Sequence, residues 1–213
     1  MDKELITYYA ERANEYERIY ERPERQSDLA AINELLQVMY TGKDVGEIAC
    51  GTGYWTQRIA KHARSVHASD INPPVLDIAK TKVYEKNNVT FEVADIFNYP
   101  LSVHDNLFAG FILSHVKKQE LDNFIDTIHK FVKPGGVVIF TDNNYVVDSN
   151  RPITHTDEDG NTYQERILEN GKKYSILKNF PTEELFFTLL KDKGDGLKYI
   201  SLKYYWVLCY NRK

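Results

Sequence analysis

A glycine turn beside an acidic residue is the feature of this 213-residue sequence with the clearest chemical meaning. A short apolar run from Val45 leads into Gly51-Thr52-Gly53, and the residues that follow have the spacing of a helix. Glycines at such a strand end let the main chain approach a ligand closely. Glu47 adds negative charge and no basic residue lies in the loop, so the turn suits a cationic ligand better than a phosphate.

Two phosphate-binding motifs are excluded by the residues around this turn. A dinucleotide site reads G-x-G-x-x-G, and Thr56 stands where the third glycine is needed for close helix packing. The lysine of a Walker motif is also absent. Two more acids, Asp70 and Asp95, end the next two predicted strands. The better interpretation is a site for a cationic ligand beside acidic strand ends.

The elements that must position these residues alternate along the chain. Strands are predicted over 44–49, 65–70, 88–95, 107–114 and 135–142, and helices over 54–63, 74–85 and 121–132. A last helix at 181–191 and two closing strands at 197–202 and 204–210 follow. This order predicts an α/β fold, with a Rossmann-like, seven-stranded and mostly parallel sheet that has helices on both faces. Ligands bind such sheets at the C-terminal ends of the strands, where the turn and the acids lie.

Two predicted helices precede the sheet. Five residues recur at intervals of three or four and so form one helix face: Ile6, Tyr9, Ala13, Tyr16 and Tyr20. This helix is expected to end before Pro23, and Ser27 to cap a second helix that stops at Gly42. Residues 1–42 are therefore predicted to form a helical cover within a single domain of residues 1–213.

The regular alternation breaks after Asp142, and residues 143–180 are predicted to be an insertion. Two alternating runs within it meet at Asn170-Gly171, which is a strong hairpin signal. A two-residue turn would place Arg166 and Lys178 on opposite faces of the hairpin. A three-residue loop with a bulge at Gly171 would place them on the same face.

Composition limits the classes of function. The net charge is −4, which argues against non-specific binding of nucleic acid. The two cysteines, Cys50 and Cys209, have neither disulfide-framework nor metal-ligand spacing, so no metal site is expected. No apolar run approaches the length of a membrane span. We expect a cytoplasmic monomer or homodimer that acts on a small molecule.

The stretch EIACGTG at 47–53 resembles motif I of the class I S-adenosylmethionine-dependent methyltransferases, with Ala49 where the family usually has glycine. The resemblance implies that Asp70 accepts hydrogen bonds from both ribose hydroxyls of the cofactor and that Ile71 packs on the adenine. It implies that Asp95, followed by Ile96, meets the adenine amino group. The stretch FVKPGGVVIFTD resembles the family's final helix, turn and fifth strand.

Within that family, several stretches are similar to phosphonate O-methyltransferases of the dehydrophos type, which methylate a small phosphonate on oxygen. They are YYAERANEYE, GTGYWT, SHV, PGGVV and ILENGKKYSILKNF. The similarity implies that Arg166 and Lys178 both contact the anionic group of the substrate, which favours the three-residue loop. It also raises the expectation that His115 faces the substrate.

The candidate site residues fall into two groups. Those expected to bind S-adenosylmethionine, or its product S-adenosylhomocysteine, are Tyr9, Glu47, Ala49, Gly51, Gly53, Trp55, Asp70, Ile71, Asp95, Ile96 and Leu113. Those expected to bind the substrate are Tyr16, Tyr20, His115, Arg166 and Lys178. His115 is also the candidate catalytic residue, because a hydroxyl or amine substrate would need a proton acceptor.

Three functions remain open at this stage. The favoured one is O-methylation of a small anion, a phosphonate or a carboxylate, whose ionised oxygen needs no strong base. The second is methylation of an amine, a phenol or a natural-product hydroxyl. The third is a regulatory protein that binds the cofactor without transferring the methyl group. Methylation of nucleic acid is disfavoured, because LSHV stands where an N-P-P-Y-like tetrapeptide would follow the fourth strand.

Overall fold

A seven-stranded sheet forms the centre of the computed structural model, which describes residues 3–97 and 102–213. In spatial order its strands are β3 (Val89–Val93), β2 (Ser65–Asp70), β1 (Asp44–Ile48), β4 (Asn106–Gly110), β5 (Val137–Asn143), β10 (Tyr205–Arg212) and β9 (Gly194–Ser201). The first five are parallel, and β10 is antiparallel to both β5 and β9. The predicted fold class is confirmed.

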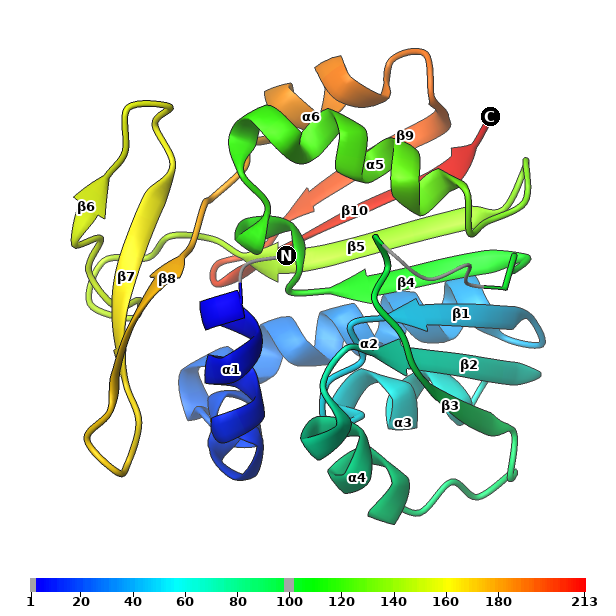
Figure 1. Ribbon diagram of the computed structural model, residues 1–213. Coiled ribbons are helices and arrows are strands. Elements are labelled where there is room, and N and C mark those ends of the chain that lie inside the picture. Colours follow the sequence, from blue (N-terminus) through cyan, green and yellow to red (C-terminus); the bar gives the residue numbers. More distant parts are fainter. Residues whose placement is uncertain (1–2, 98–101) are drawn as a thin grey trace.

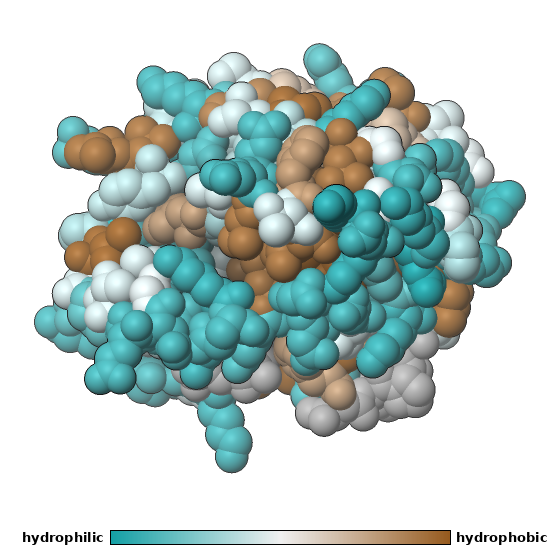
Figure 2. Space-filling model, turned by 90° about the horizontal axis from the view of Figure 1, so that it is seen from above, coloured by the Kyte–Doolittle hydropathy of each residue, from teal (hydrophilic) through white to brown (hydrophobic). Residues whose placement is uncertain are grey.

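Helices cover both faces of this sheet and divide the core in two. On one face lie α2 (Gln26–Tyr40), α3 (Tyr54–Ala60) and α4 (Pro73–Thr81), which share one buried cluster with the sheet. On the other face lie α5 (Leu121–His129) and α6 (Glu183–Leu190), which share a second cluster (Figure 1). The face seen from above in Figure 2 is mostly hydrophilic, with hydrophobic side chains gathered near its centre.

The N-terminal segment is a broken helix, whereas the sequence predicted a continuous one. It comprises α1 (Lys3–Glu11), a 3₁₀ helix η1 (Ala13–Tyr20) and a short 3₁₀ turn η2 (Pro23–Arg25). The change of helix type at Arg12 lets Tyr9 contact His115 while the Tyr20 ring stacks on Tyr54 beside the glycine turn. Residues 3–25 are called the cover below. Helix α2 begins at Gln26 with Arg25 as its N-cap residue, so Ser27 lies inside the helix and does not cap it.

The chain around β4 also differs from the prediction. The strand ends at Gly110 rather than continuing to residue 114, because Phe111 has a left-handed backbone with φ of +60°. Two short 3₁₀ turns follow, η3 (Leu113–His115) and η4 (Lys118–Glu120). The bend at Phe111 brings His115 to the end of the sheet where ligands are expected. Of the helices that the structure describes, none combines the length and the hydropathy that a membrane crossing requires.

The insertion forms a separate sheet of three strands: β6 (His155–Thr156), β7 (Thr162–Ile167) and β8 (Lys173–Leu177). Strands β7 and β8, called the hairpin below, have the register that places Arg166 opposite Tyr174. The amide of Leu168 donates to the carbonyl of Lys172, and Gly171 has a φ of +83°. The three-residue loop with its bulge is therefore confirmed. The short strand β6 was not predicted.

The cover packs on the hairpin through a small core of its own, made of Leu5, Tyr8, Leu168, Tyr174 and Ile176. Figure 1 shows α1 beside β8, in front of the ends to which the arrows of β4 and β5 point. Glu11 pairs with Lys172 at 2.6 Å and accepts a hydrogen bond from the hydroxyl group of Tyr174 at 2.6 Å. The cover and the hairpin therefore form one layer over the C-terminal end of the sheet.

Candidate active site

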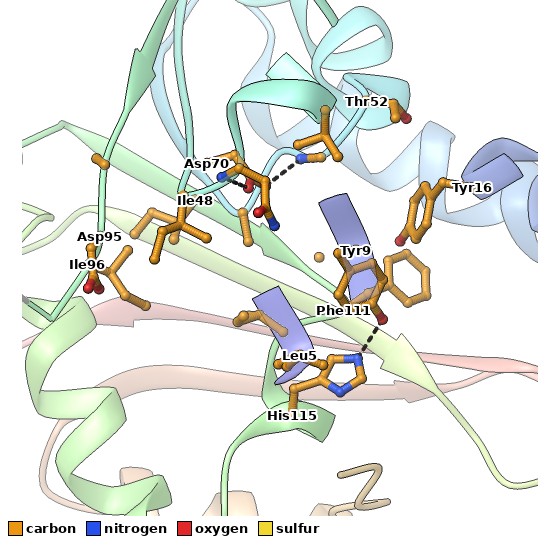
Figure 3. Close-up of a pocket in the computed structure, with 18 residues that line it drawn as sticks. Leu5, Tyr9, Tyr16, Ile48, Thr52, Asp70, Asp95, Ile96, Phe111 and His115 are labelled. Atoms are coloured by element: carbon orange, nitrogen blue, oxygen red, sulfur yellow. Dashed lines mark hydrogen bonds between the residues drawn. The ribbon is translucent and has the colours of Figure 1, made fainter. Parts of the chain in front are cut away.

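A cavity of about 740 Å³ lies where β1, β2 and β4 end, beneath the cover. Its walls are the glycine turn, the ends of these strands, and three side chains of the cover, Leu5, Tyr9 and Tyr16 (Figure 3). Its lining is mostly apolar with a few polar groups, as in small-molecule sites.

The backbone of the turn is left-handed at three positions. The φ angles are +54° at Ala49, +55° at Gly51 and +80° at Gly53. A Cβ atom at Gly53 would stand 3.0 Å from the Cβ of Ala79 on α4, so glycine is needed there for conformation and for space. Ala49 has no such freedom and holds a strained conformation beside the cavity, as residues at binding sites often do.

Asp70 at the end of β2 supports the turn and faces the cavity. The amide of Gly51 donates to its Oδ2 and the amide of Asn72 to its Oδ1, each at 2.9 Å. Burial raises the pKa of Asp70 above its ordinary value. Each carboxylate oxygen can accept more than one hydrogen bond, so the two oxygens of Asp70 can also accept hydrogen bonds from two neighbouring hydroxyl groups of a ligand.

One end of the cavity is apolar and ends in an acid. Ile71 and Ile96 line it together with Val75 and Ala94. Asp95 lies at this end, and its Oδ1 accepts a hydrogen bond from the amide of Phe97 at 3.0 Å. An apolar slot with a hydrogen-bond acceptor at its edge suits a flat heteroaromatic ring that has an amino group.

A second cavity of about 280 Å³ adjoins the first through Tyr16 and the glycine turn. It is lined by Glu47, Tyr20 and Trp55 among others. Burial, with a further contribution from Asp70, raises the pKa of Glu47 to about 8. The Oε2 of Glu47 and the indole nitrogen of Trp55 are buried without a hydrogen-bond partner among the described residues. Such atoms are rare in folded proteins, and they indicate that a polar ligand group belongs in this cavity.

His115 lies at the opposite end of the larger cavity with both ring nitrogens engaged. Its Nδ1 is 2.7 Å from the carbonyl oxygen of Leu177, so Nδ1 carries the hydrogen and donates it. Its Nε2 is then the acceptor for the hydroxyl group of Tyr9, at 2.8 Å (Figure 3). Burial, with the nearby Lys178 ammonium, lowers the pKa of His115 to about 3, so the ring is neutral at neutral pH.

The two basic residues predicted to bind the substrate lie in different surroundings. Lys178 is buried: its Nζ is 2.6 Å from the Oγ of Ser114 and 2.9 Å from the Oδ1 of Asp142. Burial opposes the charge of Asp142, but the Lys178 ammonium together with the backbone hydrogen bonds from Ser114 and Asn143 outweighs burial, and the pKa of the carboxyl group is lowered. Arg166 is half-buried on β7, outside the lining of both cavities, and within the described structure its guanidinium makes one hydrogen bond, to Gln164 at 2.6 Å.

The structure brings most of the predicted residues together. The predicted residues that line the larger cavity are Tyr9, Tyr16, Ala49, Gly51, Asp70, Ile71, Asp95, Ile96 and His115. Three further predicted residues, Glu47, Tyr20 and Trp55, line the second cavity. Gly53, Leu113, Arg166 and Lys178 are not in either lining. Gly53 lies against α4, Leu113 is in the core, and Lys178 is held by Asp142, which sequence spacing does not reveal.

Several lining residues were missed by the sequence reasoning. Thr52 and Asn72 line the cavity directly beside predicted residues. The hydroxyl group of Thr52 donates to Glu17 of the cover at 2.6 Å, which joins the turn to η1. Phe111 was assigned to a strand interior, and only its left-handed backbone turns it into the site. Their place next to the glycine turn and the strand ends is the signal that would have found the first two.

Known proteins match this arrangement in sequence and in structure. Residues 45–136 match the family described as "Methyltransferase domain". Phosphoethanolamine N-methyltransferase 1 of Triticum aestivum is 30% identical over 134 residues, which are 58% of this chain and 26% of the wheat protein. The chain thus spans about a quarter of that relative's length.

The fold, the acid-lined cavity and these matches resemble those of the class I S-adenosylmethionine-dependent methyltransferases, and they support S-adenosylmethionine as the cofactor. Its particular resemblance is to DhpI. The DhpI complex with SAH has a TM-score of 0.80 and 26% identity, and the match covers 99% of this chain and 96% of DhpI. The complex of DhpI with SAM and HEP has a TM-score of 0.79 and the same 26% identity, over 97% of this chain and 96% of DhpI. The predicted resemblance is confirmed.

Proposed function

We propose that this chain transfers the methyl group of S-adenosylmethionine to an oxygen atom of a small anionic substrate, a phosphonate or a carboxylate. The observation that carries the proposal is the state of Arg166. The other basic side chains of the segment 155–178 each pair with a carboxylate: Lys172 with Glu11, Lys173 with Glu165 and Lys178 with Asp142. Arg166 has no carboxylate within 4.0 Å among the described residues. A half-buried guanidinium in this state is stabilised by an anionic ligand.

The chemistry of the cavity also favours an acceptor that arrives ionised. His115 has a lowered pKa and both of its nitrogens are engaged, so it is poorly placed to take a proton. Glu47, with its pKa raised to about 8, is protonated at neutral pH. A phosphonate or carboxylate oxygen already carries its negative charge and needs neither residue as a base.

The cofactor would lie along both cavities. Asp70 would bind the ribose hydroxyls, Ile71 and Ile96 would enclose the adenine, and Asp95 would accept from its amino group. The carboxyl group of Glu47 and the indole of Trp55 would meet the amino-acid end in the second cavity. The bound cofactor supplies an already activated methyl group, so the chain has to orient the acceptor, hold it close and exclude water. The cover, with Tyr9 and Tyr16, would exclude water from the cavity.

The relatives support an anionic acceptor and also define the alternative. DhpI forms a complex with SAM and HEP, and the wheat relative is named for phosphoethanolamine, which carries both a phosphate and an amine. Methylation of an amine or a hydroxyl group is therefore the second candidate. It would require His115 to release Tyr9 before the imidazole accepts a proton.

Methyl transfer from labelled S-adenosylmethionine to a panel of small phosphonates, carboxylates and amines tests the proposal. For the best acid, Arg166→Gln should raise the apparent Michaelis constant about 10- to 100-fold, because a charge-assisted hydrogen bond is lost. Affinity for S-adenosylhomocysteine should stay unchanged. Lys173→Gln is the matched control on the same hairpin, because Lys173 is exposed and pairs with Glu165. Transfer to amines alone, or normal kinetics of Arg166→Gln, would refute the proposal, and no transfer at all would favour a regulatory protein.

A further inference from the structure

Three tyrosines where the cover meets the cavity stand beside a second unpaired guanidinium. The rings of Tyr8 and Tyr9 are 5.0 Å apart, and those of Tyr9 and Tyr16 are 5.8 Å apart. The guanidinium carbon of Arg12 lies 5.7 Å from the centre of the Tyr8 ring and 5.3 Å from that of Tyr16. Arg12 is half-buried at the junction between α1 and η1, so the break in the helix determines where its side chain lies.

Arg166 lies on the face of the hairpin that packs against Tyr8 of this group. It stands opposite Tyr174 in the register of β7 and β8, and the ring of Tyr174 is 5.4 Å from that of Tyr8. Burial lowers the pKa of Arg166, and the Arg12 guanidinium lowers it further. Arg12 and Arg166 therefore stand on the two sides of the boundary between the cover and the hairpin, with Tyr8 and Tyr174 in contact between these segments.

Neither guanidinium has a counter-ion within residues 3–97 and 102–213. All other ion pairs that join the cover to the hairpin are complete: Arg18 pairs with Glu169, and Lys172 with Glu11. Within 4.0 Å of Arg12 or Arg166 the described chain places no carboxylate oxygen. Two like charges that share a half-buried location repel each other, and an anion between them removes the repulsion. Lys178 adds no net charge here, because Asp142 neutralises it.

We infer that Arg12 and Arg166 form a two-guanidinium clamp that binds the acid group of the substrate from two sides, one arginine from the cover and one from the hairpin. This inference rests on the proposed function, since it concerns the same acid group. Two planar, permanently charged groups suit a tetrahedral acid with two negative charges better than a carboxylate with one. The clamp also joins the cover to the hairpin through the substrate, so the cavity is fully closed only when the acid is present.

A structural role is the competing explanation for Arg12. Its guanidinium stacks on two tyrosines, and such cation–π contacts alone stabilise a surface helix. The two explanations differ in what Arg12 variants change. A purely structural Arg12 affects the cover and hence the cofactor, whatever the anion. A clamp residue affects binding of the acid while the cofactor site stays intact.

Isothermal titration calorimetry distinguishes the structural role of Arg12 from the clamp. Inorganic phosphate and acetate are each titrated into the chain saturated with S-adenosylhomocysteine. Inorganic phosphate is mainly a dianion at about pH 8 and should bind more tightly than acetate. Arg12→Met keeps an apolar stem against the tyrosines and should weaken phosphate binding about tenfold or more, as loss of a charge-assisted hydrogen bond does. Arg12→Lys keeps the charge, so its affinity for phosphate should lie between that of Arg12→Met and that of the unaltered chain. Arg18→Met is the matched control in the cover and should bind phosphate as the unaltered chain does.

The outcomes distinguish this inference from the proposed function. If Arg12→Met binds phosphate normally while Arg166→Met does not, the clamp is refuted and the anion site at Arg166 stands. If Arg12→Met loses affinity for S-adenosylhomocysteine and phosphate by the same factor, Arg12 is structural and the clamp is again refuted. If both variants bind phosphate normally, or if the unaltered chain binds neither anion, the proposed function fails together with the clamp.

Discussion

Replacing Lys178 with methionine tests whether this residue is part of the structure or part of the substrate site. The Lys178 and Asp142 side chains are 5% and 0% exposed, and their ion pair is 2.9 Å long. Lys178→Met removes the ammonium and leaves Asp142 buried with the hydroxyl group and the amide of Ser114 as partners. Breaking a buried pair from one side costs about 3–5 kcal/mol, because the remaining charge is left without a counter-ion. We therefore expect the free energy of unfolding to fall by about that amount.

Urea unfolding of three variants measures this effect. Lys173→Met removes an exposed ion pair to Glu165 and should change stability by about 0–1 kcal/mol. Asp142→Asn combined with Lys178→Met removes both charges and should recover part of the loss. If Lys178→Met were as stable as Lys173→Met while its Michaelis constant rose, Lys178 would be a substrate contact, as the sequence suggested, and the structural reasoning would be refuted.

Three further predictions concern the turn, the second cavity and the cover. Ala49→Gly should stabilise the chain by about 0.5–1 kcal/mol in chemical denaturation, because glycine relieves the left-handed strain but loses more chain entropy on folding. Since the pKa of Glu47 is raised from 4.5 to about 8, the ligand-free chain should lose stability as pH rises through that interval; urea midpoints should show this fall, and Glu47→Gln should lack it. Amide exchange over residues 6–20 should slow when S-adenosylhomocysteine binds, since Leu5, Tyr9 and Tyr16 line its cavity, and equal exchange with and without the ligand would count against a mobile cover.

The sequence predicts the sheet and the grouping of residues around the glycine turn well, because the signals there are local. A strand, a glycine turn and a helix follow one another within 20 residues, and Asp70 and Asp95 are placed by the ends of their own strands. The hairpin register is different, because the local Asn170-Gly171 signal allows two registers; the resemblance favoured the three-residue loop with its bulge at Gly171, which the structure has.

Local sequence patterns do not predict the contacts between distant segments. The correct register places Arg166 and Lys178 on one face, yet it does not reveal that Asp142 lies beneath Lys178. His115 follows its strand as expected, but its two hydrogen bonds come from Leu177 and Tyr9, which are 62 and 106 residues away. The helix break at Arg12 likewise depends on the contacts of Tyr9 with His115 and of Tyr20 with Tyr54. The spacing of the tyrosines alone fits a continuous helix.

The small core between the cover and the hairpin has a consequence for the order of folding. The bonds from Glu11 to Lys172 and Tyr174, and from the amide of Ser175 to Glu4, join residues 161, 163 and 171 positions apart. Helix α1 therefore leaves the ribosome well before its partner strand β8 has been synthesised. Contacts of such separation form late, because the chain between them must first be ordered by other interactions. The sheet can thus assemble around an open cavity, and the chain acquires its cover in one of the last steps of folding.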